Sequence, residues 1–122
     1  KRINPWVDID THTAVLTTQN VPELFGGVDV LVEALDDADA KAMLADVFTR
    51  TRPGVPLVLA SGVAGCAPAN RVRTRTLAGN LVCVGDETTA AEPGTGLMAP
   101  RVGIAAHHQA NAVVRCLLGE TP

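Results

Sequence analysis

Two short segments of the chain, residues 28–34 and 55–60, are almost continuously apolar. Runs of this kind are typical of strands that are covered on both faces, as in a parallel sheet. Between them, residues 38–50 are rich in good helix formers, and their apolar side chains recur at helical spacing. Because parallel strands need a crossover connection, the pattern predicts a βαβ unit over residues 28–60.

Upstream of this unit, β-branched side chains that partly alternate over residues 6–16 predict a long strand. A short helix is expected next, since Asn20 is a favoured cap residue and Glu23 stands at the capping-box position. The adjacent residues Gly26 and Gly27 are expected to end that helix.

Downstream of residue 65, the spacing of polar and apolar residues changes from helical to alternating. Residues 71–76 alternate charged and smaller side chains and residues 81–84 are apolar, which predicts an antiparallel hairpin. A turn-rich loop is expected over residues 86–96, followed by a helix from about Ala99 that Gly119 stops. The predicted buried stripe of this helix consists of Val102, Ala106, Ala110, Val113 and Leu117.

Length and composition narrow the class of protein. A chain of 122 residues with 47% hydrophobic and 19% charged side chains suits one domain with its own core. The net charge of −3 argues against a nucleic-acid binder with a basic patch, and no apolar run is long enough for a membrane helix. Three isolated cysteines favour a reducing compartment, the cytoplasm, and without a C-x-x-C pair no zinc site is expected.

Two adjacent acids, Asp36 and Asp37, are the best candidates for chemistry. They stand where a buried strand ends and a helix begins, and this is the crevice in which open α/β sheets bind ligands. A carboxylate there can hold Mg²⁺ or accept a hydrogen bond from a ribose hydroxyl. The alternative is structural: aspartate is a favoured helix cap, and Lys41 lies four residues after Asp37, the spacing of a surface ion pair.

Other polar residues give weaker signals. Ser61 also ends a buried strand, but a nucleophile elbow needs glycine two residues earlier and Leu59 is there, so Ser61 is interpreted as lining a site. His107 and His108 are adjacent on a predicted helix and therefore point about 100° apart. Together with the isolated His12, they are interpreted as packing or surface residues. Neither a G-x-G-x-x-G nor a G-x-x-x-x-G-K-[ST] phosphate loop is present.

Taken in order, several segments resemble the later half of the ThiF/MoeB/HesA family, bacterial relatives of ubiquitin-activating enzymes. The matching stretches are Arg2-Ile-Asn-Pro5, residues 28–37, residues 56–61, residues 96–103 and the closing residues 109–119. The likeness covers nearly the whole chain and is greatest to the short ThiF-like branch that lacks the zinc cysteines. It implies a Rossmann-like α/β fold, here a parallel βαβ unit with an antiparallel hairpin and a C-terminal helix.

The resemblance also implies an activity: ATP-dependent adenylation of the C-terminal glycine of a ubiquitin-fold sulfur carrier, ThiS-like, in thiamine biosynthesis. Asp36 matches the family's catalytic aspartate that contacts Mg-ATP, and it is the implied Mg²⁺ ligand. Asp37 and Lys41 would join it in binding the nucleotide, although Asp37 stands where asparagine is usual. The loop at residues 86–96 matches the segment that crosses over the carrier's tail, with residues 92–94 replacing the cysteine stretch of some members.

The family's glycine-rich loop and phosphate-binding residues lie upstream of the Arg-Ile-Asn-Pro match. We therefore expect residues 1–122 to be a single domain, the later part of a longer ThiF-like domain, and inactive alone. The opening residues Lys1 to Pro5 agree, since they read like the last turn of a helix. The alternatives are a non-catalytic docking or dimerisation module of the same fold, or half of a dinucleotide-binding oxidoreductase. The hairpin edge and the last helix, rich in small residues, favour a homodimer.

Overall fold

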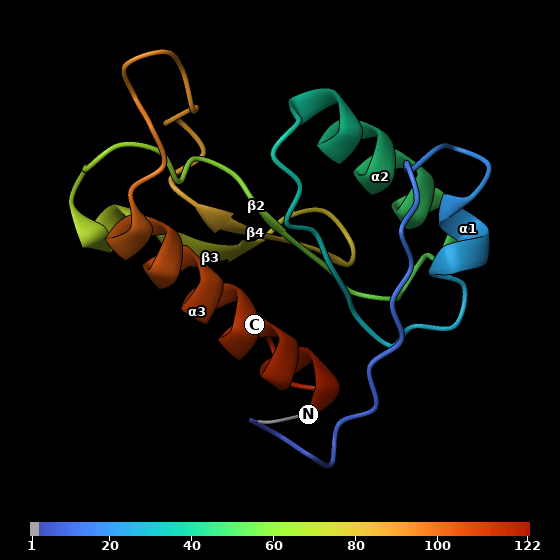
Figure 1. The fold of residues 1–122 in the computed structure, drawn as a ribbon. Coiled ribbons are helices and arrows are strands. Elements are labelled where there is room, and N and C mark those ends of the chain that lie inside the picture. The colour runs from blue at the N-terminus through green and yellow to red at the C-terminus, as the bar shows by residue number, and fades with distance from the viewer. Residues whose placement is uncertain (1–2) are drawn as a thin grey trace.

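A computed structural model describes residues 3–122, in which a four-stranded sheet carries one long helix on each face (Figure 1). Lys1 and Arg2 lie outside the described residues, and with them the start of the expected helix end and the first residue of the Arg2-Ile-Asn-Pro5 match. The elements in chain order are α1 (Val21–Leu24), β1 (Leu31–Val32), α2 (Ala38–Thr51), β2 (Leu57–Ala60), the 3₁₀ turn η1 (Ala69–Arg71), β3 (Arg73–Thr76), β4 (Leu81–Gly85) and α3 (Ala99–Leu117).

The sheet has the strand order β1-β2-β4-β3. β1, β2 and β4 run parallel, and β3 pairs antiparallel with β4. This confirms the predicted βαβ unit, hairpin and closing helix, and with them the mixed α/β fold class. None of the described helices is both long and apolar enough to cross a bilayer.

Two apolar cores lie on opposite faces of the sheet because neighbouring residues of a strand point to opposite sides. Leu57 of β2 packs with Phe48 and other residues of α2 on one face. Val58, the next residue, packs with Ala105 and Ala112 of α3 on the other face. The three parallel strands are thus held between α2 and α3, and their carboxyl ends are left at one edge.

Two predicted strands differ from the structure. Residues 6–16 form no strand, and most of their side chains are exposed, because no strand within residues 3–122 pairs with them to complete a hydrogen-bond ladder. The strand expected over residues 28–34 is reduced to the two residues of β1. Before it, the Val28 carbonyl accepts a hydrogen bond from the Arg52 guanidinium (3.2 Å) instead of joining the sheet.

The expected capping box at the first helix is also wrong. Asn20 is the N-cap of α1, but its side chain makes no cap hydrogen bond. Its carboxamide oxygen accepts from the Thr17 N–H and its nitrogen donates to the Val15 carbonyl, each at 2.8 Å. The reason lies in the sequence: Pro22 occupies the second helical position and has no N–H to offer the cap.

The buried side of α3 differs from the predicted stripe as well. Ala106, Ala110 and Leu117 are exposed, and the residues that are buried are Arg101, Ala105, Gln109 and Ala112. Two of these four are polar. They can be buried because residues beyond the helix bond to the carboxamide of Gln109 and to both terminal nitrogens of Arg101, although the Arg101 Nε has no partner in the described residues. A stripe chosen for hydrophobicity cannot anticipate such partners.

Candidate functional site

Three polar groups gather where the parallel strands end. Glu33 follows β1, Ser61 follows β2 and Asp86 follows β4, so all three lie at the carboxyl edge of the sheet. Backbone hydrogen bonds join the segments that follow β2 and β4. The Ser61 N–H donates to the Val84 carbonyl (2.9 Å), and the Glu87 N–H donates to the Ser61 carbonyl (3.1 Å). In open α/β proteins, this edge is the one that binds ligands.

A buried ion pair ties the end of β1 to α2. The Glu33 side chain is 1% exposed, and its carboxylate lies 3.0 Å from the Lys41 ammonium. Lys41 also donates to the carbonyl of Ala60 at the end of β2 (3.2 Å). On the other face, the carboxamide nitrogen of Gln109 donates to the Glu33 backbone carbonyl (3.1 Å). The group therefore fixes β1, β2 and both long helices relative to one another.

A second buried pair joins the end of β4 to the start of α3. The Asp86 carboxylate lies 2.6 Å from the Arg101 guanidinium, and the two side chains are 2% and 4% exposed. Arg101 also donates to the carbonyls of Ala67 (2.9 Å), Pro68 (3.3 Å) and Gly62 (3.4 Å). The guanidinium thus holds the segment after β2 against the base of the long loop.

The other oxygen of Asp86 organises the beginning of that loop. It accepts hydrogen bonds from the backbone and hydroxyl groups of both Thr88 and Thr89, at 2.9–3.0 Å. Burial by itself raises the pKa of Asp86, but these four hydrogen bonds outweigh it and hold the pKa well below the usual aspartate range. The residue therefore keeps its negative charge at any physiological pH.

This lowered pKa predicts acid sensitivity. The folded protein keeps the charge of Asp86 to lower pH than the unfolded chain, whose aspartates titrate near about 3.9. The contribution of Asp86 to stability is then complete above that pH and is lost as pH falls below it. Urea unfolding across this range should show stability falling with acidity, with a smaller slope in Asp86→Asn. If stability fell equally steeply with pH in both proteins, Asp86 would not be the source of the acid sensitivity.

The sequence-predicted residues lie beside the first of these pairs. Asp36 is exposed, three residues beyond Glu33, and its carboxylate takes part in no hydrogen bond or ion pair within residues 3–122. Asp37 caps α2, with its carboxylate accepting from the Ala40 N–H (2.8 Å). The expected surface ion pair between Asp37 and Lys41 is absent from the described residues, because Lys41 turns to the buried carboxylate instead.

Ser61 and the histidines form no catalytic arrangement in the part of the chain described. Ser61 is exposed and has no histidine among its partners. His107 lies 2.7 Å from the Gly103 carbonyl, whereas His108 lies 3.0 Å from the Thr74 hydroxyl, so the two rings have separate structural partners. No group of three or more His, Cys, Asp or Glu side chains in residues 3–122 could hold a metal ion.

Sequence reasoning missed the two buried ion pairs, although each leaves a signal. Glu33 is an acid within an apolar run, eight residues before Lys41. Arg101 stands in the first turn of α3, where the helix dipole disfavours a cation, so its presence there calls for a specific acidic partner. What the sequence could not supply was the identity of that partner, Asp86, since the pairing runs between separate elements.

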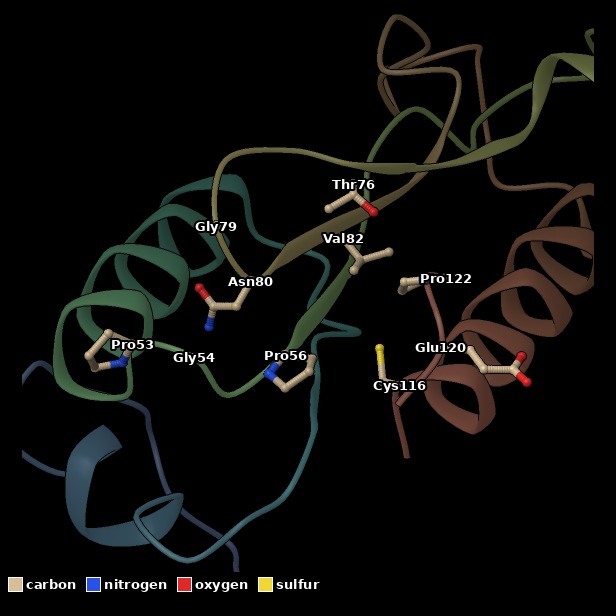
Figure 2. Close-up of a pocket in the computed structure, with 10 residues that line it drawn as sticks. All are labelled: Pro53, Gly54, Pro56, Thr76, Gly79, Asn80, Val82, Cys116, Glu120 and Pro122. Atoms are coloured by element: carbon tan, nitrogen blue, oxygen red, sulfur yellow. The ribbon is translucent and has the colours of Figure 1, made fainter. Parts of the chain in front are cut away.

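Two cavities of similar size lie at opposite edges of the sheet. One, of about 420 Å³, lies at the carboxyl edge between the segment after β2 and the loop before α3, which the Gly65 N–H and the Gly96 carbonyl join (2.9 Å). The other, of about 450 Å³, lies at the amino ends of β2 and β4 (Figure 2). Its lining is mainly apolar, with the Cys116 thiol directed into it, and the Glu120 carboxylate pairs with Arg115 (2.9 Å).

The fold and edge described above define an α/β protein of the kind that binds ligands at the carboxyl ends of parallel strands. The sequence profile of the ThiF family matches residues 1–122, so the chain belongs to the ThiF family. A solved structure, that of the Escherichia coli tRNA N6-threonylcarbamoyladenosine dehydratase TcdA in complex with AMP, superposes with a TM-score of 0.68 at 17% identity.

That superposition shows a shared fold. It covers 95% of this chain and 61% of the TcdA chain, so the chain spans about three fifths of the length of that protein. Comparison with proteins of curated function gives no sequence match. As a member of this family, the chain has an adenylyltransferase-type fold of the ubiquitin-activating-enzyme class.

Proposed function

We propose that this chain is the later part of an ATP-dependent adenylyltransferase that activates the C-terminal glycine of a ubiquitin-fold sulfur carrier. Within that class we assign it to ThiS-like carriers and thiamine biosynthesis, on the strength of the short ThiF-like pattern of the sequence. In this reaction a carboxylate oxygen of the carrier attacks the α-phosphorus of ATP. The bond between the α- and β-phosphates breaks, and pyrophosphate leaves with its electron pair.

The observation that carries the proposal is the state of Asp36. It is an exposed carboxylate with no protein partner in residues 3–122, at the carboxyl edge of a ThiF-family sheet. The nearby Glu33 and Lys41 are already paired with each other. The Asp36 carboxylate is therefore available to a ligand at this strand end. The AMP bound to TcdA, which shares this fold, supports a nucleotide as that ligand.

The donor set fits Mg²⁺. This ion is commonly bound by one or two carboxylates together with substrate phosphates and water, so a single free aspartate suffices as the protein ligand. When bound, Mg²⁺ neutralises negative charge that otherwise repels the attacking carboxylate. Asp36 would hold the metal and Asp37 would keep the strand-to-helix turn in shape through its cap to Ala40. Lys41 would contribute a positive charge beside the nucleotide.

The long loop would complete the site for the carrier. Asp86 anchors its first residues through Thr88 and Thr89, while the Gly65 N–H holds its far end by donating to the Gly96 carbonyl. The loop is thus held at both ends, beside the cavity of about 420 Å³ that Gly94 and Gly96 help to line. The glycine-ended tail of the carrier would enter that cavity.

The setting we propose is a cytoplasmic homodimer. The three cysteines are free thiols, which suits a reducing compartment. Val114, Leu117 and Leu118, at the end of α3, are 53–69% exposed, and such an apolar cluster is typical of a surface covered by a partner. A second copy of the chain is the simplest partner for it.

The test is Asp36→Ala in the intact protein. ATP–pyrophosphate exchange in the presence of the carrier should fall by about 10²-fold, the usual cost of removing one electrostatic contact to a transition state. Urea stability should change by less than about 0.5 kcal/mol, because the side chain is exposed and unpaired. The matched control is Asp39→Ala, which removes the same charge from an exposed position in the first turn of α2.

Two results would contradict the proposal. Unchanged exchange in Asp36→Ala would leave a docking or dimerisation module as the better interpretation. An equal loss in Asp39→Ala would mean that general negative charge matters and that Asp36 has no specific role.

A further inference from the structure

The strand β3 leaves one of its edges open. It is the last strand of the sheet, paired with β4 on one side and with no other strand in residues 3–122. The backbone N–H and C=O groups along its outer side are therefore available to another extended chain. Addition of a peptide strand to such an edge is a common mode of protein recognition.

The open strand carries a row of arginines on one face. Arg73 and Arg75 alternate with Thr74, whose hydroxyl meets His108 of α3 on the opposite face. With Arg71, which precedes the strand, they line a hollow of about 210 Å³. This face of β3 is the one not covered by α3, so the guanidinium groups stand in solvent.

The row has a surplus of positive charge. Arg75 pairs with Glu87 (2.7 Å). Arg71 donates to the Thr88 hydroxyl (3.3 Å), and its guanidinium lies 4.0 Å from the Asp86 carboxylate. The guanidinium of Arg73, between them, takes part in no hydrogen bond or ion pair within the described residues. Asp86, which also lines the hollow, is one negative charge shared between two arginines, the buried Arg101 and Arg71. The surplus is notable because the chain as a whole has a net charge of −3.

We propose that β3 is the docking site for an extended acidic segment of a partner protein. The segment would pair as a further strand along the open edge, with acidic side chains at every second position opposite Arg73 and Arg75. The period of two follows from strand geometry, because only alternate residues of the incoming strand share a face with the arginines. The inference is independent of the adenylation proposed above.

Charge decides between this occupant and the other candidates. Two copies of the chain joined through β3 would bring arginine rows together, and like charges facing each other across strands are destabilising. A nucleic acid would meet the arginines but would leave the strand's backbone groups unpaired, and the chain is acidic overall. An acidic strand satisfies both the guanidinium groups and the open edge.

The experiment uses two labelled short peptides of equal composition. One alternates glutamate with threonine, and the other places the threonines first and the glutamates in one block. Fluorescence anisotropy with the intact protein should show tighter, salt-sensitive binding of the alternating peptide. Arg73→Gln should weaken it about fivefold, the worth of one good surface ion pair. Arg50→Gln, which removes an exposed arginine from α2, should change it less than twofold.

Hydrogen exchange provides a second measurement, the protection of backbone amides, which electrostatic attraction without strand pairing would not change. Backbone amides of residues 73–76 that face the open edge should become protected when the alternating peptide binds. Four results would overturn the proposal: no binding of either peptide, equal binding of both, equal weakening by Arg50→Gln, or binding without protection at β3. Tighter binding of a single-stranded RNA that Arg73→Gln weakens would assign the row to nucleic acid instead.

Discussion

Asp86→Ala is expected to destabilise the fold by about 3 kcal/mol, the usual cost of breaking a buried ion pair by removing one partner. The reason is the group left behind: Arg101 is 4% exposed, and without its carboxylate it stays charged in a place that water hardly reaches. The same change removes four hydrogen bonds to Thr88 and Thr89. Against a typical domain stability of about 5–15 kcal/mol, a loss of this size is readily measured by urea unfolding.

An exposed ion pair provides the matched control. Asp46→Ala breaks the pair with Arg50, whose closest atoms are also only 2.7 Å apart but whose side chains are 65–67% exposed. It should cost no more than about 0.5 kcal/mol. A double variant, Asp86→Val with Arg101→Met, should recover part of the loss because no unpaired charge remains. Equal costs for Asp86→Ala and Asp46→Ala would mean that the buried pair contributes no more than a surface one.

The elements that the sequence predicts correctly are those in which local and tertiary preferences agree. In residues 38–51, good helix formers, an acidic cap at Asp37 and a basic last turn at Arg50 all favour the same helix. The apolar run of β2 and the turn before β4 likewise carry their own signals. These elements need no knowledge of what packs against them, and their bounds agree with the structure within a few residues.

The features that the sequence does not predict depend on partners far along the chain. Residues 6–16 have a strand-like pattern, but a strand exists only when a neighbour completes its ladder. On α3, Gln109 is buried because the Glu33 carbonyl lies opposite it, 76 residues away in sequence. In the candidate site, position at a strand end identified Asp36 and Asp37 as acids at the carboxyl edge of the sheet. Only coordinates could show that Asp37 caps a helix while Asp36 stays unpaired.

Lys41→Met is expected to cost about 3 kcal/mol, since it leaves the Glu33 carboxylate 1% exposed and without its cation. The methionine chain fills the space of the lysine stem, so the loss reports charge rather than packing. The link from α2 to the Ala60 carbonyl is lost as well. The β1 and β2 ends at the candidate site should loosen together, which hydrogen exchange at residues 33–35 and 60–62 can measure.

A second variant, which keeps the charge of the lysine, identifies the cause. Without its cation, the Glu33 carboxylate would be left buried and unpaired. Lys41→Arg, which keeps a positive charge, should therefore restore most of the stability, whereas a loss due to packing would remain. If Lys41→Met instead left stability unchanged and weakened only nucleotide binding, the lysine would be a ligand-binding group. The ion pair with Glu33 would then contribute nothing to the fold.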